Sequence, residues 1–404
     1  MLPNGWKVSS VSEICKLQNG NSFKPDEWDK KGLPIIRIQN LNGSKNFNYF
    51  SGVPQERWLV ETGDLLFSWA GTKGVSFGPF IWKGERGVLN QHIYKVSAKN
   101  DIDHKWLFYV LKYVTVIIEG KAHGFKATLL HVKKQDIDDQ VILLPPISEQ
   151  QKIAKILSTW DKAISMTERL IDNSTQQKKA LMQQLLTGKK RLLDDEGKRF
   201  EGEWELKKVS DYFDVSSSKR VLQEDWKEDG VPFYRTRELV SLAKNEPFRS
   251  SIYIADDYYE ELIAKYGMPD EGDFLVSGVG TLGIIYQVRE NDKFYFKDGN
   301  VLWFRKEKEV SSDFFKYCFL SDYIQNQINI QASVTTVGTY TITNAKKTKF
   351  HCPPLEEQQK IAAVLNNADK EIGLLEQQLA DLQQEKKALM QVLLTGKKRV
   401  LVDR

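Results

Sequence analysis

The residues best suited to chemistry in this sequence are hydrogen-bonding side chains at predicted strand ends and in glycine-rich loops. Such side chains bind base edges and phosphate oxygens. In residues 1–144 the set consists of Arg37, Gln39, Asn40, Thr72, Lys73, Asn90, Gln91 and His92. The segment 120–128 adds Lys121, His123 and Lys126 around an aromatic residue, and its two glycines permit close approach. We interpret these residues as a candidate nucleic-acid surface.

A second set of the same kind lies between residues 194 and 352. Its members are Lys219, Arg220, Arg235, Arg237, Thr281, Thr335, Thr336 and Tyr340. The segment 332–341 occupies the position of 120–128 but is rich in hydroxyl groups and holds no cation. Base readout by this segment and a plain polar turn both remain open. The arginines and Lys219 are then the best-placed cations, with a solvated surface charge as the alternative for each.

A search for catalytic motifs is negative. The sequence has no GxxxxGK[ST] loop, no HExxH and no CxxC motif. The double prolines read Leu-Pro-Pro-Ile and Cys-Pro-Pro-Leu, without the acid or amide and the aromatic residue of a base-amino methyltransferase loop. Acidic pairs such as Asp138-Asp139 lack a lysine on a following strand, and the histidines lack metal-ligand spacing. We therefore predict no catalytic residue, no metal site and no cofactor bound by this chain.

The strongest pattern in the sequence is an internal repeat. Residues 145–193 (PPISEQQKIAKIL…KKALMQQLLTGKKRLL) return without a gap as residues 353–401. A weaker match in the preceding segments relates Trp6, Val11, Trp28 and Arg37 to Trp204, Val209, Trp226 and Arg235. The whole half is thus duplicated, but the globular parts have diverged much further than the tails. A protein with approximate twofold symmetry can bind a partner that also has twofold symmetry, such as duplex DNA.

Each tail predicts one long amphipathic helix, the second over about residues 356–395. Apolar residues recur at alternating steps of four and three, which is a heptad seam. The predicted coiled-coil and partner-binding positions are Ile153, Leu157, Trp160, Ile164, Leu181, Leu185, Ile361, Leu365, Ile372, Leu375, Leu379, Leu382, Leu389 and Leu393. Antiparallel pairing within the chain is the simplest arrangement, and parallel homodimerisation is the alternative. Lys178 and Lys386 fall on the seam, where it either opens or lets the alkyl stems snorkel.

The fold class predicted from these patterns is α+β. Short β-branched runs at 33–39, 64–68 and 88–96, with counterparts at 231–236, 273–277 and 301–304, read as strands. Residues 105–119 and 312–329 have helical spacing. We predict two mixed α/β domains, 1–144 and 194–352, separated by two long antiparallel helices, 145–193 and 353–404, that form a coiled coil with pseudo-twofold symmetry. The Gly-Lys-Lys-Arg ends of both helices either compensate the helix dipole or bind a phosphate or partner.

Composition narrows the class of protein. The chain has 404 residues and a formal net charge of +4, positive in 1–144 and negative in 202–352, so global charge does not by itself indicate DNA binding. No apolar run reaches the roughly 20 residues of a membrane span. The three cysteines are far apart, and the first residues lack the features of a signal peptide. We expect a soluble cytoplasmic protein.

With these motifs in view, the sequence resembles the specificity (S, HsdS) subunits of type I restriction-modification systems. The resemblance rests on the Pro-Pro-x-x-Glu-Gln-Gln-Lys-Ile-Ala segments at 145 and 353, on the Leu-Leu-Thr-Gly-Lys-Lys-Arg ends of both helices, and on the Gly-Asp-φ-Leu-x-Ser signature at 63–68 and 272–277. It covers essentially the full chain. In that family the globular units are target recognition domains, the helices are conserved spacers, and catalysis belongs to other subunits.

The resemblance implies a function and a set of partners. Each recognition domain would bind one half of a bipartite, asymmetric site in double-stranded DNA, with the helices setting the spacer. Two methyltransferase (M) subunits would dock on the chain, and restriction (R) subunits would join them. S-adenosylmethionine, and ATP with Mg for restriction, would be bound by those partner subunits. The rival hypothesis is a non-catalytic coiled-coil scaffold that holds two protein-binding domains apart.

Overall fold

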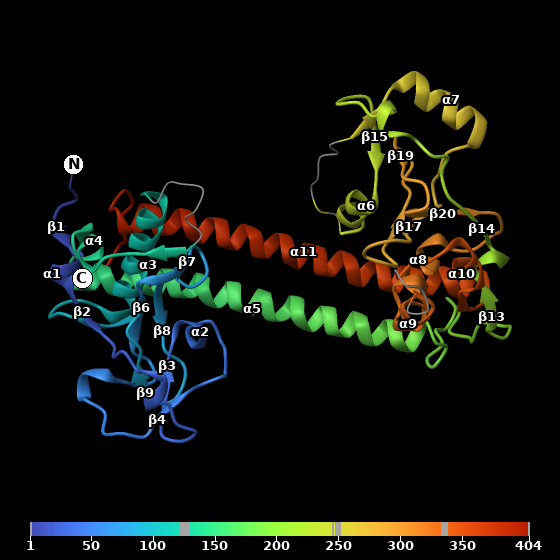
Figure 1. The fold of residues 1–404 in the computed structure, drawn as a ribbon. Helices are drawn as coiled ribbons and strands as arrows, with labels where there is room; N and C mark the ends of the chain where they lie inside the picture. Colours follow the sequence, from blue (N-terminus) through green and yellow to red (C-terminus); the bar gives the residue numbers. More distant parts are fainter. Residues whose placement is uncertain (1, 122–128, 245, 247–251, 333–337, 403–404) are drawn as a thin grey trace. The chain divides into compact units, whose positions relative to one another are not determined.

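A computed structural model of the chain describes residues 2–121, 129–244, 246, 252–332 and 338–402. It divides into two units (Figure 1), of which unit 1 comprises Met1–Arg169 with Gln377–Arg404 and unit 2 comprises Leu170–Glu376. Each unit therefore contains one globular part and segments of both long helices. Among the described residues, no helix is long and apolar enough to cross a membrane.

Unit 1 is built on two four-stranded sheets. The first has the strand order β2-β10-β6-β8 and is antiparallel throughout, and the second has the order β4-β3-β9-β5 with a parallel β3–β9 pair. Pairs β1–β12 and β7–β11 complete the unit. The strands are β1 (Lys7–Ser10), β2 (Cys15–Asn19), β3 (Leu33–Ile36), β4 (Tyr49–Phe50), β5 (Leu59–Val60), β6 (Leu65–Ser68), β7 (Ala70–Thr72), β8 (Gly78–Ile81), β9 (Gly87–Leu89), β10 (Ile93–Ala98), β11 (Leu129–His131) and β12 (Val141–Leu144). The helices before α5 are α1 (Val11–Ile14), α2 (Ile38–Leu41), α3 (His104–Lys121) and α4 (Lys134–Asp138).

The central strand β6 explains how the layers of unit 1 pack. All four of its residues are buried, and successive side chains of a strand point to opposite faces. Leu65 and Phe67 belong to the large core that includes Trp106 and Leu111 of α3, whereas Leu66 belongs to a smaller core facing the second sheet. The antiparallel sheet is thus covered on both faces, which accounts for its continuous apolar run.

Unit 2 repeats this plan with different details. Its antiparallel sheet has the order β14-β20-β17-β18, and a three-stranded sheet β16-β15-β19 and the pair β13–β21 accompany it. The strands are β13 (Glu205–Lys208), β14 (Phe213–Ser216), β15 (Val231–Tyr234), β16 (Tyr253–Ile254), β17 (Phe274–Ser277), β18 (Ile285–Gln287), β19 (Tyr295–Phe296), β20 (Val301–Lys306) and β21 (Lys349–Cys352). The helices are α6 (Thr236–Ala243), α7 (Asp256–Tyr266), α8 (Ser312–Leu320), α9 (Asp322–Ala332) and α10 (Ile342–Lys347).

The two long helices are α5 (Ile147–Leu185) and α11 (Leu355–Leu394), and both are unbroken (Figure 1). In unit 1, Asp161 of α5 pairs with Lys386 of α11, and in unit 2, Lys178 of α5 pairs with Asp369 of α11. Residues late in one helix therefore meet residues early in the other, which confirms the antiparallel prediction.

Several predicted elements differ from the structure in detail. The predicted strand 33–39 ends at Ile36, because the chain turns into the short helix α2. The predicted strand 88–96 is two strands, β9 and β10, separated by a turn at residues 90–92. The predicted helix 312–329 is two helices broken at Ser321, whose backbone is extended. The helix predictions for 105–119 and 356–395 are confirmed within two residues at each end.

Candidate nucleic-acid interface

Arg37 is a predicted cation of unit 1 that forms no ion pair with any acidic side chain among the described residues. It precedes α2, and its backbone amide donates to Asn40 Oδ1 at 3.0 Å. Its guanidinium lies 5.5 Å from the ring centroid of Trp28, a cation–π contact. Its Nε is buried and, among the described residues, has no hydrogen-bond partner. A buried donor without a partner is rare. Because Nε is closed to solvent in this conformation, an external acceptor would contact the terminal nitrogens of the half-buried Arg37 side chain.

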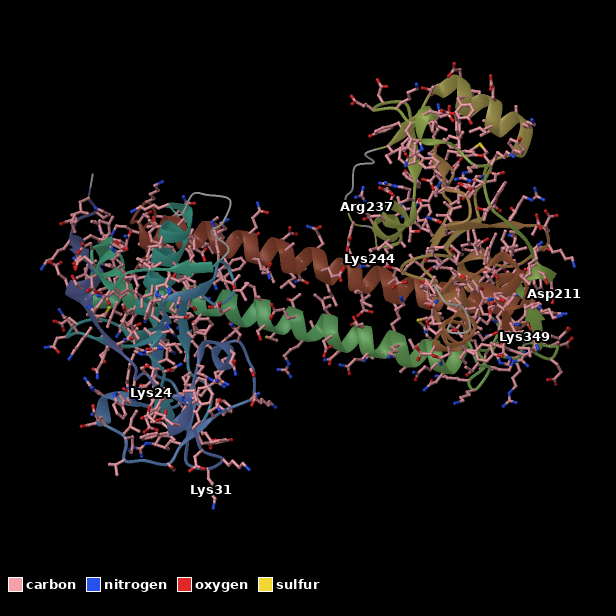
Figure 2. The ribbon with its side chains drawn as sticks, in the orientation of Figure 1. Lys24, Lys31, Asp211, Arg237, Lys244 and Lys349 are labelled. Atoms are coloured by element: carbon pink, nitrogen blue, oxygen red, sulfur yellow. The ribbon has the colours of Figure 1, made fainter. Side chains whose placement is uncertain are left out.

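Arg235 occupies the same place in unit 2 but is neutralised. It precedes α6, and its backbone amide donates to Glu238 Oε2 at 3.1 Å, where Asn40 stands in unit 1. Its guanidinium also donates twice to the Glu238 carboxylate, at 2.8 and 3.2 Å. Arg237, labelled in Figure 2, donates to the same carboxylate at 2.9 Å. Burial raises the pKa of Glu238, but these hydrogen bonds outweigh burial and hold the pKa below its usual value.

Two residues that were predicted to contact bases, Tyr340 and Asn40, are instead buried and hydrogen-bonded within the chain. Tyr340 is 1% exposed and its hydroxyl lies 2.7 Å from Thr348 Oγ1, so it is part of the unit 2 core and the prediction of a base contact is wrong. Asn40 is 6% exposed, and its side chain is consumed by the amide of Arg37 and the carbonyls of Ser44 and Asn46. The prediction that Asn40 reads a base is also wrong. Both polar tips are occupied by the neighbouring backbone or hydroxyl, which sequence alone does not reveal.

The other predicted contacts stay predictions, with these surroundings. Gln39 donates to the carbonyl of Asn46, Lys73 Nζ donates to the carbonyl of Glu119, and Lys121 is exposed at the end of α3. Thr72 and Gln91 are half-buried, and Thr281 is exposed. In unit 2, Lys219 lies 5.7 Å from the ring of Tyr266 and Arg220 is exposed. His123, Lys126, Thr335 and Thr336 lie outside the described residues.

Sequence reasoning missed a cluster of three rings in unit 1. The ring centroids of His92 and His131 lie 5.1 and 4.7 Å from that of Trp69, and 6.0 Å from each other. Trp69 Nε1 is 3.2 Å from both Asn19 Oδ1 and the carbonyl of Gln91. Burial, and to a smaller extent His131, lowers the pKa of His92. The rings come from three separate strand ends, so no local spacing marks them.

Backbone hydrogen bonds identify the positions of this cluster in unit 2. The amide of Trp69 donates to His92, and the amide of Gly278 donates likewise to Asn300. The carbonyl of Trp69 accepts from Val132, as that of Gly278 accepts from Tyr340. The Trp69, His92 and His131 positions are therefore held by Gly278, Asn300 and Thr339. One backbone frame presents three rings in unit 1 and small polar groups in unit 2.

The match to a family model decides the identity of this arrangement. The model described as the type I restriction modification DNA specificity domain matches the chain twice, over residues 3–174 and 201–384. The chain belongs to this family. It is a type I restriction-modification specificity subunit with two target recognition domains, the first in unit 1 and the second in unit 2.

Individual relatives agree with the family match. The chain is 26% identical to the MjaVIII specificity subunit of Methanocaldococcus jannaschii, covering 99% of this chain and 94% of the relative. It is 25% identical to the EcoBI specificity subunit of Escherichia coli, covering 89% and 78%. The S subunit from M. genitalium has a similar fold, with a TM-score of 0.56 at 16% identity over 98% of each chain. A chain from a structure on complex assembly and conformational transition of the type I R-M system gives a TM-score of 0.62 at 16% identity, covering 98% of this chain and 100% of that chain.

The family motifs at the ends of the long helices form contacts within this specificity subunit. Glu149 Oε2 accepts from Trp6 Nε1 at 3.1 Å, and Arg399, from the Gly-Lys-Lys-Arg end of α11, pairs with the same carboxylate. In unit 2, Glu357 accepts from Trp204 Nε1 at 3.1 Å and from Arg191 at 2.6 and 3.1 Å. We call these two triplets the helix-end clasps. The arginines of the Gly-Lys-Lys-Arg motifs thus bind carboxylates of their own chain.

The motif glutamines and glycines support the same clasps. Gln150 links the amide of Asp103 to the carbonyl of Pro145, and Gln358 links Ser311 to Pro353 in the same way. Gly396 has a φ of +66°, and a Cβ there would lie 2.7 Å from Pro3 and 3.3 Å from the Trp6 ring. A side chain at this position would therefore displace the end of α11 from the first recognition domain.

The predicted coiled-coil positions separate into two classes. Ile153, Leu157 and Leu393 are buried in the core of unit 1, and Leu185, Ile361 and Leu365 in that of unit 2. These end positions, with the partly buried Leu181 and Leu389, pack into the recognition domains as well as along the helix pair. Trp160, Ile164, Ile372, Leu375, Leu379 and Leu382 are half-buried, as expected for a two-helix seam with solvent on both sides.

Proposed function

We propose that this specificity subunit selects a bipartite, asymmetric site in double-stranded DNA, with each recognition domain reading one half-site and the long helices setting the spacer. The observation that carries the proposal is the contrast at one equivalent position. Within the part of the chain that the structure describes, Arg37 has no carboxylate partner beside Asn40, whereas Arg235 and Arg237 share Glu238. Two domains that share a backbone arrangement but present different hydrogen-bond donors can recognise different base sequences.

The chain itself is proposed to be non-catalytic. Among the described residues, no group of three His, Cys, Asp or Glu side chains is arranged to hold a metal ion. The three cysteines are buried, and burial raises the pKa of each thiol, which disfavours a reactive thiolate. Two methyltransferase subunits would supply methylation with S-adenosylmethionine, and restriction subunits would supply ATP- and Mg-dependent cleavage. The assembly would act in the cytoplasm, where its DNA is.

A mobility-shift assay with random-sequence duplexes tests this proposal. The chain with its cognate methyltransferase subunit should retain duplexes that share two short, dissimilar half-sites at a fixed separation. The absence of sequence-selective binding would contradict the proposal and favour a scaffold, whereas selective binding to a single continuous site would contradict the bipartite reading. A methylation assay on the chain alone should give no product, and methyl transfer in that assay would refute the non-catalytic assignment.

A further inference from the structure

Each recognition domain is joined to the long helices by a polar triplet that consists of a buried tyrosine, a largely buried lysine and a partly exposed aspartate. In unit 1, Tyr109 Oη of α3 donates to Asp161 Oδ2 of α5 at 2.5 Å, and Lys386 of α11 pairs with the other carboxylate oxygen. Lys386 Nζ also lies 5.6 Å from the Tyr109 ring centroid. We call Tyr109, Asp161 and Lys386 the first node. It ties three helices together at a single carboxylate.

The second node repeats this arrangement in unit 2. Tyr317 Oη of α8 lies 2.6 Å from Asp369 Oδ2 of α11, and Lys178 of α5 pairs with Asp369 Oδ1. Lys178 Nζ lies 5.2 Å from the Tyr317 ring. The helices exchange roles, since α5 supplies the acid in the first node and the lysine in the second. Seventeen positions separate Asp161 from Lys178 and Asp369 from Lys386, so one antiparallel register satisfies both nodes.

The nodes show whether the apolar seam opens at Lys178 and Lys386. Lys386 is 8% exposed and Lys178 is half-buried, so the seam does not open at either position. Burial opposes the ionised form of Asp161, but hydrogen bonds from Lys386 and Tyr109 outweigh it and hold its pKa below the usual value. Burial and the bond to Asp161 raise the pKa of Tyr109, which therefore keeps its proton and remains a donor. The first node is thus held as a charged triplet.

Polar groups on an apolar helix seam can contribute more to the choice of a single helix register than to the free energy of unfolding. A heptad seam of aliphatic residues can be satisfied again after a slip of seven residues, because the same pattern recurs. The two ion pairs oppose the slip, since any other register leaves the largely buried lysines without their carboxylates. Replacing such a pair with apolar residues often leaves stability unchanged. Register and stability can therefore be separated by mutation.

We infer that the two nodes, acting together with the helix-end clasps, fix the register of α5 against α11, and with it the DNA spacer length that the specificity subunit accepts. Asp161 and Asp369 act as positioning residues and touch no DNA. The tyrosines extend this role, because they attach α3 and α8 of the recognition domains to the same carboxylates. The inference rests on the proposed bipartite reading of DNA. A slip of one heptad moves a helix by about 10.5 Å, which equals about three base pairs of B-DNA.

The test replaces both ion pairs by apolar residues in the full chain bound to its methyltransferase subunit. The variant carries Asp161→Leu, Lys386→Met, Asp369→Leu and Lys178→Met. A matched control carries the same kinds of substitution at exposed positions of the same helices, namely Asp172→Leu, Lys387→Met, Asp381→Leu and Lys179→Met. The readouts are helical content by circular dichroism and the methylated sites in a random-sequence duplex library. The library gives the half-sites and the spacer length separately.

We expect the node variant to keep its helical content and both half-sites but to methylate a second, minor class of sites, with spacers displaced by about three base pairs. This class should be minor because the intact helix-end clasps still favour the native register. The control should keep a single spacer length. A single, unchanged spacer in a fully helical node variant overturns the inference. Wild-type methylation without two separated half-sites would instead overturn the proposed function, so the two failures are distinguishable.

A reciprocal exchange covers the case in which the apolar variant does not fold. Asp161→Lys alone places two lysines at the first node and should reduce methylation at the wild-type spacer by at least tenfold. Adding Lys386→Asp restores an ion pair of opposite polarity and should restore methylation at that spacer. Wild-type methylation by the Asp161→Lys variant, or a folded double variant that remains as impaired as Asp161→Lys, contradicts the role of the node.

Discussion

The two recognition domains are alike where they meet the long helices and unlike at the edges of their sheets. The helix-end clasps use Trp, Glu and Arg in both units, and the nodes use Tyr, Asp and Lys in both. By contrast, Arg37 beside Asn40 becomes Arg235 beside Glu238, and the Trp69 ring cluster becomes Gly278, Asn300 and Thr339. The backbone frame persists while the exposed chemistry changes.

This contrast suggests that contacts within the chain help to keep the two repeated tails nearly identical in sequence. Docking of two identical methyltransferase subunits, which the resemblance implies, would be one reason for their near-identity. In the structure, Glu149 pairs with Arg399, and Gln150 bonds to Asp103 and Pro145. In unit 2, Glu357 pairs with Arg191, and Gln358 bonds to Ser311 and Pro353. Each clasp joins the start of one helix to the residues that follow the end of the other. The motif is therefore constrained by folding, whatever docks on its outer surface.

The largest expected effect comes from breaking a helix-end clasp. Glu357 has no exposed side-chain surface, so Glu357→Ala leaves the Arg191 guanidinium and the Trp204 indole without their acceptor. We expect a loss of about 3 kcal/mol in the free energy of unfolding. Urea unfolding with hydrogen exchange of the β13 amides would measure it. The exposed neighbour Glu356→Ala is the control, and equal losses in the two variants would contradict the role of the clasp.

The next largest effect should separate the two equivalent arginines. Arg37→Ala should weaken binding to duplexes carrying the first half-site by about 1–3 kcal/mol, because its guanidinium has no internal acid to satisfy. Arg235→Ala should instead lower stability, because it removes two hydrogen bonds to the buried Glu238. Mobility shifts and urea unfolding of both variants measure the difference. Equal losses of affinity would show that the contrast at this position has no functional meaning.

A smaller effect should come from the ring cluster on acidification. The pKa of His92 is lowered from 6.5, chiefly by burial. A histidine with a lower pKa in the folded state takes up a proton on unfolding, so its stabilising contribution is complete above about pH 6.5 and falls below it. Hydrogen exchange of the β10 amides should therefore quicken between about pH 7.5 and pH 5.5, beyond its intrinsic pH dependence. His92→Asn, which copies Asn300, should remove the extra change, and its persistence in that variant would contradict this assignment.

The smallest expected effect concerns an exposed cation. Lys121 lies at the end of α3 with its side chain exposed. If it contacts a phosphate, Lys121→Gln weakens binding to all duplexes equally and reduces the slope of log affinity against log salt by about one. Salt titrations of the mobility shift measure this slope. A change restricted to one base sequence would assign Lys121 to base readout instead.

The sequence predicts the elements and domains that follow from periodicity and motifs. It does not predict contacts between residues that are far apart in the chain. The heptads predicted both long helices, and the repeat predicted two domains of one plan. Tyr340 and Asn40 were misassigned because a polar side chain in a loop segment looks the same whether it faces solvent or the neighbouring backbone. The clasp of Trp6, Glu149 and Arg399 joins three separate segments, and nothing in their local spacing indicates it. The partner of Lys386 likewise lies 225 residues away.

The most direct test of the central claim exchanges one recognition domain. A chain in which residues 201–352 replace residues 3–144, with both long helices and both nodes retained, carries the second recognition domain twice. Sequencing of the sites methylated by this chain with its methyltransferase subunit should return a symmetric site, with the second half-site on both sides of an unchanged spacer. Methylation at the original asymmetric site would contradict the claim that diverged domains on a shared helix frame read the two halves.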